Sequence, residues 1–226
     1  MNTIAYHKIL DELKPAKVQL LAVSKTRTPD EIRELYGRGQ RDFGENYVQE
    51  LVEKHSALPD DIRWHFIGHL QSNKVKYIAP FVYMIQGVDS EKLILEIGKQ
   101  ANKNDRKIRC LLQVHIAREE TKFGFNEREL MELVDSVSGL RQANQINQVQ
   151  VSGLMGMASM TESKEQIRNE FKYLKLLFDR LKSALPQDPF DTLSMGMSSD
   201  YQIAIEEGST MIRIGTALFG ERKYDK

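Results

Sequence analysis

The sequence has a single cysteine, no long apolar run and no excess of either charge. Cys110 is the only cysteine in the 226 residues, so an intramolecular disulfide and a cysteine-rich metal site are both excluded. No apolar run approaches the roughly 20 residues that a membrane-spanning helix needs, and the first residues lack the charge and apolar pattern of a signal peptide. We therefore expect a cytoplasmic protein that binds no membrane.

The charges are balanced, with 32 lysines and arginines against 32 aspartates and glutamates. Because the formal net charge is zero, the chain has no global basic field that would attract nucleic acid. Hydrophobic residues make up 41% of the chain and charged residues 28%, as in ordinary globular proteins. This length allows one large domain with a substantial core, and we expect residues 1–226 to form a single domain.

Hydrophobic periodicity predicts eight strands that alternate with helices. The predicted strands span residues 18–24, 41–46, 63–69, 83–88, 108–116, 151–157, 192–195 and 211–215. A helix at residues 3–13 precedes them, and others are predicted at residues 29–36, 47–56, 73–78, 91–100, 127–137, 164–185, 200–207 and 216–219. Short connections imply a parallel sheet, and eight units predict a (β/α)8 TIM barrel. Residues 138–150, rich in Gln and Asn, are interpreted as a surface loop within one unit.

Lys25 ends the first predicted strand. It follows the apolar stretch Val18–Ser24, and a helix start follows it at Thr28, with Pro29 suited to the first helical position. Lys25 is therefore expected at the carboxyl end of a buried strand, where parallel α/β folds place their chemistry. Partial desolvation there would lower the pKa of the amine and free it to form a Schiff base. The alternative is a solvated lysine at a strand end.

Two turns that contain glycine and hydroxyl groups follow the last two predicted strands. Gly196–Asp200 offers serine hydroxyls before a helix, and Arg213–Thr216 leads into another helical start. Backbone N–H groups at such starts attract anions, and barrels of this kind bind phosphate with the loops after their last two strands. Each turn alone is compatible with an ordinary loop. Their occurrence in both final units favours a small ligand that carries a phosphate.

Two histidines, His65 and His69, lie four residues apart on the third predicted strand and would share one face of it. No acidic residue or third ligand has a matching spacing, so we predict packing or ligand contact for them rather than a metal site. Cys110 lies near the start of its strand, away from the expected site, and is assigned no catalytic role.

Five motifs occur in a characteristic order and spacing. They are Ala22-Val-Ser-Lys-Thr26, Phe43-Gly-Glu-Asn-Tyr47, Trp64-His-Phe-Ile-Gly-His-Leu-Gln-Ser-Asn-Lys74, Leu193-Ser-Met-Gly-Met-Ser198 and Ile212-Arg-Ile-Gly-Thr216. Together they resemble the YggS/PROSC family of pyridoxal 5′-phosphate (PLP) homeostasis proteins, nearly from end to end. The resemblance implies a single-domain, monomeric barrel similar to the N-terminal domain of alanine racemase.

The resemblance also implies roles for individual residues. Lys25 is expected to hold PLP covalently as a Schiff base, and Arg213 to lie near the pyridine nitrogen. The other implied contacts are Ser198, Gly215 and Thr216 at the phosphate, and Asn46, His65 and Met157 at the ring or its substituents. Lys122 matches a second lysine that can also engage PLP in some members of the family.

The function that the resemblance implies is that of a PLP carrier or regulator in vitamin B6 homeostasis, without turnover of its own and with PLP-dependent apoenzymes as candidate partners. We expect no β-rich second domain of the kind that fold-related racemases carry. Racemisation needs a base on each face of the substrate, and besides Lys25 the nearest candidate is Tyr47. Two alternatives remain: a PLP-dependent amino-acid racemase, and a phosphate-binding barrel enzyme without PLP.

Overall fold

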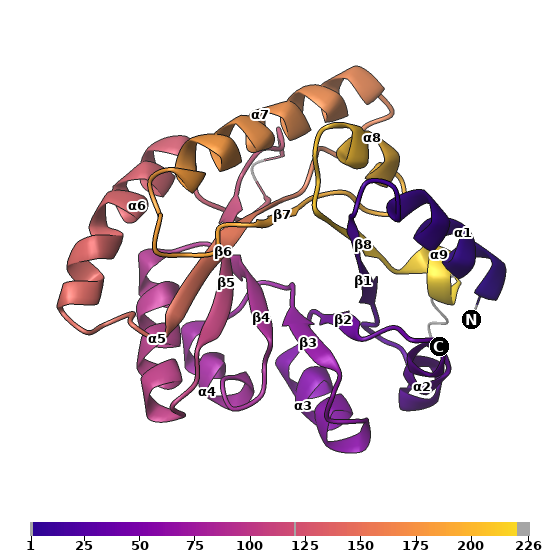
Figure 1. Ribbon diagram of the computed structural model, residues 1–226, viewed down its shortest axis with the longest axis horizontal. Helices are drawn as coiled ribbons and strands as arrows, with labels where there is room; N and C mark the ends of the chain where they lie inside the picture. The colour runs from indigo at the N-terminus through magenta and orange to yellow at the C-terminus, as the bar shows by residue number, and fades with distance from the viewer. Residues whose placement is uncertain (1, 120, 221–226) are drawn as a thin grey trace.

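The computed structural model describes residues 2–119 and 121–220, which form a closed barrel of parallel strands (Figure 1). The strands are β1 (Gln19–Val23), β2 (Asp42–Glu45), β3 (Arg63–Phe66), β4 (Met84–Val88), β5 (Ile108–Val114), β6 (Val149–Gly156), β7 (Thr192–Ser194) and β8 (Met211–Ile214). Each strand pairs with the next one along the chain, and β8 closes the barrel by pairing with β1. The predicted (β/α)8 TIM barrel is confirmed.

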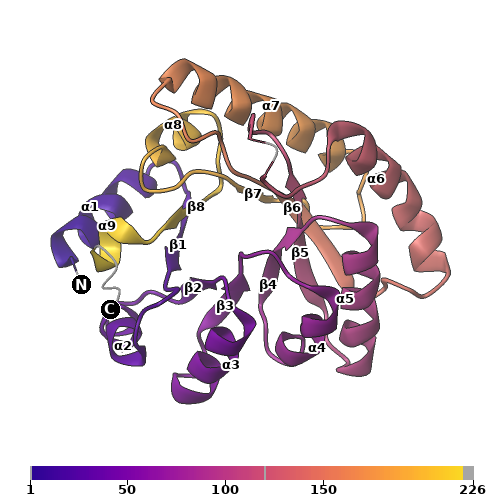
Figure 2. The same ribbon diagram turned by 180° about the vertical axis from the view of Figure 1, so that it is seen from behind.

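Helices surround the barrel, as the two opposite views show (Figures 1 and 2). They are α1 (Thr3–Leu13), α2 (Pro29–Gly37), α3 (Val48–Ala57), the 3-10 turn η1 (Ser72–Lys74), α4 (Val75–Ile78), α5 (Glu91–Lys103), α6 (Glu127–Gln142), α7 (Lys164–Lys182), α8 (Tyr201–Glu206) and α9 (Thr216–Phe219). No helix within the described residues is long and apolar enough to cross a membrane.

The start of α2 fixes where the loop after β1 ends. The Thr28 hydroxyl accepts a hydrogen bond from the Glu31 N–H, and the Glu31 carboxylate accepts one from the Thr28 N–H, which completes a capping box. Pro29 occupies the first turn, where its missing N–H costs nothing. This confirms the predicted helix start, so the loop that carries Lys25 is short and held at both ends.

The predicted surface loop at residues 138–150 is mostly regular structure. Helix α6 continues to Gln142, and β6 already begins at Val149. A capping box at Asn126 and the buried residues up to Val137 anchor this helix, so its exposed last turn remains helical although its composition is polar. A loop is present within this unit, but it spans only residues 143–148; its predicted start was too early because an exposed helical turn and a loop have similar compositions.

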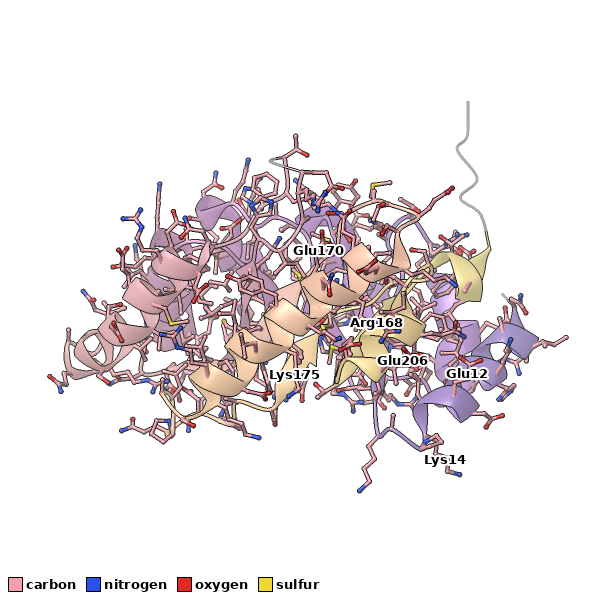
Figure 3. The ribbon with its side chains drawn as sticks, turned by 90° about the horizontal axis from the view of Figure 1, so that it is seen from above. Glu12, Lys14, Arg168, Glu170, Lys175 and Glu206 are labelled. Carbon is pink, nitrogen blue, oxygen red and sulfur yellow. The ribbon has the colours of Figure 1, made fainter. Side chains whose placement is uncertain are left out.

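The N-terminal helix α1 braces the elements that follow β7 and β8. In Figure 1 it lies beside α9, and the Asn2 N–H donates to the Leu218 carbonyl at 2.7 Å. The Tyr201 hydroxyl at the start of α8 donates to Glu12 of α1 at 2.7 Å. Figure 3 shows Arg168 of α7 beside Glu206 of α8, and the two form an ion pair. The two turns predicted to bind phosphate therefore lie on a braced part of the barrel.

Candidate functional site

One cavity of about 330 Å³ lies at the carboxyl ends of the strands. Its lining residues come from β1, β2, β3, β6, β7 and β8 or from the loops that follow them: Val23, Lys25, Asn46, Ile67, Met155, Met157, Met197, Ser198, Ser199, Arg213, Gly215 and Thr216. Seven of the eight site residues expected from the sequence are among them. This volume is within the usual range for small-molecule sites, roughly 300–1,000 Å³.

The eighth expected residue, His65, does not line the cavity. Its side chain is fully buried inside the barrel and contacts Asp42 and Gln86. Ile67, two residues further along, lines the cavity instead. Because alternate residues of a strand share one face, His65 faces the barrel interior one layer deeper than Ile67. The structure therefore does not bring His65 into the cavity lining with the other expected residues, and its contact with a ligand stays a prediction.

Lys25 is half-buried, two residues after the end of β1. The next residue, Thr26, has a φ of 65°, in the left-handed region that β-branched residues rarely adopt. The Ser24 N–H donates to the Gly44 carbonyl at 3.0 Å, which continues the β1–β2 pairing up to the residue before Lys25. Lys25 therefore directly follows the last paired residue of the strand, where the chain turns toward α2.

Arg213 lines the cavity from β8 and is itself buried. Its Nη1 donates to the carbonyl and hydroxyl oxygens of Ser194, both at 2.8 Å, and its Nη2 donates to the Gly156 carbonyl at 3.0 Å. Burial lowers the pKa of Arg213 to about 10, and the charge of Asp200 opposes this shift. The guanidinium is therefore a buried cation at neutral pH whose three hydrogen-bond acceptors are uncharged.

A chain of hydrogen bonds runs from Arg213 through the barrel interior. The Ser194 hydroxyl accepts from Arg213 and donates to Gln86 Oε1 at 2.8 Å. Gln86 Nε2 lies 3.0 Å from His65 Nδ1, and His65 Nε2 lies 3.0 Å from Asp42 Oδ1. Because an amide nitrogen only donates, His65 Nδ1 accepts and its ring proton is on Nε2. Every donor in the chain is thus oriented toward Asp42.

Asp42 ends this chain as a carboxylate. Burial acts to raise its pKa, but hydrogen bonds from His65 and Arg63 outweigh burial and hold the pKa of Asp42 well below its usual range. Burial lowers the pKa of His65, so its imidazole is neutral near pH 7. A fixed negative charge therefore lies at the other end of the chain that orients Arg213.

The turn after β7 depends on Gly196. Its φ is 97°, and a Cβ atom on this residue would lie 2.6 Å from the Cβ of Ala204. The carboxylate of Asp200 accepts a hydrogen bond from the Met197 N–H at 2.6 Å, which closes the turn around Ser198 and Ser199. These two serines are exposed and present their hydroxyl groups at the cavity.

The turn after β8 and the turn after β7 both line the cavity. Helix α9 begins at Thr216, and its first N–H groups have no acceptor within the helix. The Gly215 position is close-packed, since a Cβ atom there would lie 3.3 Å from Val23. Together, the serine hydroxyls of the first turn and the amides and Thr216 hydroxyl of the second form a cup of donors suited to a phosphate group.

Asn46 contributes a polar atom that lacks a partner. Its Oδ1 is buried and forms no hydrogen bond with the described residues, although the residue lines the cavity. Unpaired buried polar atoms are uncommon in folded proteins and are frequently satisfied by ligands. A bound molecule with a hydroxyl group beside Asn46 would supply the missing donor.

Two other candidates from the sequence, Tyr47 and Lys122, lie outside the cavity lining, as does Cys110, to which no role was assigned. Tyr47 is 58% exposed at the start of α3. Lys122 donates from Nζ to the Ala158 carbonyl at 2.6 Å and to Glu119 at 3.1 Å. Cys110 is buried, and burial raises the pKa of its thiol. Among the described residues, no cluster of three or more His, Cys, Asp and Glu side chains could hold a metal ion.

Five lining residues are not among the eight expected site residues. They are Val23, Ile67, Met155, Met197 and Ser199. Val23 and Met155 each lie two residues before an expected site residue, so strand periodicity from Lys25 and Met157 could have identified them. Ser199 is next to Ser198 in the same turn. Val23, Ile67, Met155 and Met197 give the cavity most of its apolar lining.

Comparison with known proteins identifies the family to which this chain belongs. A family model described as the alanine racemase N-terminal domain matches residues 6–223. The pyridoxal phosphate homeostasis protein of Aquifex aeolicus is 44% identical over 211 residues, which cover 91% of this chain and 88% of that protein. The chain belongs to the pyridoxal phosphate homeostasis family. The resemblance inferred from its motifs is confirmed.

More distant members of the family match with similar completeness. The human pyridoxal phosphate homeostasis protein is 38% identical over 227 residues, which cover 95% of this chain and 80% of that one. The structure of PipY from Synechococcus elongatus without PLP superimposes with a TM-score of 0.87, at 37% identity, and covers 96% of this chain and 98% of PipY. The structure of PipY with PLP bound gives a TM-score of 0.83 at 36% identity and the same coverage.

Proposed function

We propose that this protein binds PLP covalently at Lys25 and acts as a carrier or regulator in vitamin B6 homeostasis. The observation that carries the proposal is that a single cavity brings together Lys25, Arg213 and the donor cup at Ser198, Gly215 and Thr216. An aldehyde, a pyridine ring and a phosphate on one small molecule would match these three features. The same cavity offers the unpaired Oδ1 of Asn46 to a ring hydroxyl and the side chain of Met157 to the ring.

Attachment requires only Lys25 and the aldehyde. The Nζ amine adds to the aldehyde carbon, a C=N bond replaces the C=O bond, and one water molecule leaves. When bound, PLP supplies an electrophilic carbon and a ring that can accept electrons. This addition needs the neutral form of the Lys25 amine.

Arg213 would limit how strongly a bound PLP ring accepts electrons. A cation placed at the pyridine nitrogen disfavours protonation of that nitrogen, which reduces the ability of the ring to accept electrons. Since the pKa of Arg213, lowered by burial, is still about 10, the guanidinium keeps its charge at neutral pH. The hydrogen bonds to Ser194 and Gly156 hold it in place against the cavity.

The cavity lining supports a carrier rather than a racemase. Racemisation needs a second acid–base group beside Lys25, and the described residues that line the cavity include no Tyr, His, Cys, Asp or Glu. Tyr47, the candidate from the sequence, is largely exposed and outside this lining. We therefore favour storage or delivery of PLP by a cytoplasmic monomer, with PLP-dependent apoenzymes as recipients.

Titration with PLP tests the proposal. The wild-type protein is expected to develop the absorbance of a lysine Schiff base with a saturable, one-to-one stoichiometry. The Lys25→Ala variant should lose this absorbance and keep its circular dichroism spectrum, whereas Lys92→Met, which removes an exposed lysine of α5, should behave like wild type. Saturable absorbance in Lys25→Ala, or none in the wild type, would refute covalent binding at this residue.

A second measurement separates the carrier from the racemase. Amino acids are added to the PLP-loaded protein in deuterium oxide, and incorporation of deuterium at the α-carbon is followed by NMR. We expect no exchange above that of free PLP. Exchange that depends on Lys25 would favour the racemase.

A further inference from the structure

A buried ion cluster lies directly behind the loop that carries Lys25. It consists of Glu45 at the end of β2 and of Glu50 and Lys54 on α3. Lys54 Nζ lies 2.8 Å from Glu45 Oε1 and 2.6 Å from Glu50 Oε1. The side chains of Lys54 and Glu45 are 5% and 0% exposed and so are shielded from solvent, whereas Glu50 is 22% exposed at the edge of the cluster.

This cluster binds both neighbours of Lys25. Lys54 Nζ donates to the Ser24 carbonyl at 2.7 Å, and the Ser24 hydroxyl donates to Glu45 Oε1 at 2.5 Å. On the other side, the Thr26 N–H donates to Glu50 Oε1, the same oxygen that contacts Lys54. Residues before and after Lys25 are therefore held by one group of three charges, with Lys54 at its centre.

The conformation held in this way is an unfavourable one. Thr26 has a φ of 65°, and left-handed backbone is rare for β-branched residues, so the chain would leave it without external contacts. Burying a lysine with two glutamates is also costly compared with apolar packing. Apolar side chains such as Leu51 on the same helix would suffice to pack α3 onto the barrel. Stability alone therefore does not account for the cluster. Holding the Ser24–Thr26 backbone in its strained conformation does account for it.

We infer that Lys54 is a positioning residue that fixes the Ser24–Thr26 backbone so that the Lys25 amine is directed into the cavity. This inference rests on the proposed function, because it concerns how fast Lys25 reaches the aldehyde of a bound ligand. Lys54 contacts the backbone of the loop and does not line the cavity, so it acts only through Lys25. Ligand groups held by the donor cup are independent of it.

The test compares two ligands and two variants. PLP reports on condensation with Lys25 by stopped-flow absorbance, and pyridoxine 5′-phosphate, which has no aldehyde, reports on ring and phosphate binding by calorimetry. The variants are Lys54→Met and the double variant Glu45→Gln/Lys54→Met, in which the buried partner charge is also removed so that folding is preserved. Lys92→Met serves as the control for loss of a lysine on an outer helix.

We expect both Lys54 variants to condense with PLP about ten- to a hundredfold more slowly, as for a modest displacement of a reacting group. Their dissociation constants for pyridoxine 5′-phosphate should match that of wild type. Adding Thr26→Gly to Lys54→Met should restore part of the rate, because glycine adopts a positive φ without strain. A lack of any recovery would count against the inference.

Two further results would overturn the inference that Lys54 positions Lys25. Condensation at the wild-type rate in both Lys54 variants would show that the cluster does not position Lys25. A loss of affinity for pyridoxine 5′-phosphate as large as the loss in the rate of PLP condensation would show that Lys54 supports the structure in general. If the wild-type protein itself formed no adduct with PLP, the proposed function would fail instead, so the two failures are distinguishable.

Discussion

Asp42 and Arg213 are joined through the barrel interior by hydrogen bonds that pass through Ser194, Gln86 and His65. The first is a carboxylate whose pKa is held low by His65 and Arg63, and the second is a cation that lines the cavity. Because all the donors are oriented the same way, the chain has a single arrangement of protons. The barrel interior thus fixes the position of Arg213 from behind.

Replacing Ser194 with alanine interrupts this chain next to Arg213. Gln86 Oε1 would lose the donor it has at 2.8 Å, and an unpaired buried acceptor costs about 1–3 kcal/mol. Arg213 would keep its contacts with the carbonyls of Ser194 and Gly156. Denaturant unfolding should therefore show Ser194→Ala to be less stable than wild type by that amount. As a control, Ser138→Ala, which changes an exposed serine, should have almost no effect on stability. Equal stabilities of the two variants would show that the Ser194 hydroxyl does not stabilise the interior chain.

Glu45 makes the stability depend on pH around neutrality. Burial raises the pKa of Glu45 to about 7, although the Lys54 ammonium and the Ser24 hydroxyl oppose the shift. The folded state therefore favours the protonated acid. The resulting stabilisation is complete below pH 4.5, the usual pKa, and is lost as the pH rises through 7.

The full contribution of this shift is up to about 3 kcal/mol, at 1.36 kcal/mol for each pKa unit. The Glu45→Gln variant has no proton to lose at this position. Its free energy of unfolding should therefore decline less than that of wild type between pH 5 and pH 8 in chemical denaturation. Parallel pH profiles for the two proteins would show that Glu45 does not titrate in this range.

Gly196 should tolerate no side chain. Alanine there would be strained at a φ of 97° and would contact Ala204 at 2.6 Å, which together should cost about 2–4 kcal/mol of stability. Displacement of the turn should also weaken the binding of pyridoxine 5′-phosphate. Gly139→Ala is the matched control: it lies in α6 with no atom within 4 Å of the added Cβ, and should stabilise the protein by up to about 1 kcal/mol. Similar effects of both changes would refute this account of the turn.

Much of the fold could be predicted because the signals are local. Apolar runs of strand length, the capping residues Thr28 and Glu31, and the regular alternation of elements were sufficient for the eight-stranded barrel. The end of α6 could not be predicted, since Ser138–Gln142 is as polar as a loop and only packing up to Val137 shows that the helix persists. Local composition does not report whether an exposed turn is helical.

The residues of the candidate site also fall into those that could be predicted from the sequence and those that could not. Lys25, Gly215 and Thr216 could be placed because each follows the end of a predicted strand. His65 could not, because its depth in the barrel depends on the relative register of neighbouring strands, which one strand alone does not reveal. The contact between Lys54 and Ser24 joins residues 30 positions apart and leaves no pattern in the sequence.

The identity of the residue that carries PLP tests the account most directly. The protein is incubated with PLP, reduced with borohydride and digested with trypsin, which does not cleave after a modified lysine. We predict a single labelled peptide, Val18–Arg27, with the modification on Lys25 and none on Lys122. Label on Lys122 alone, label spread over many surface lysines, or no label would contradict the account.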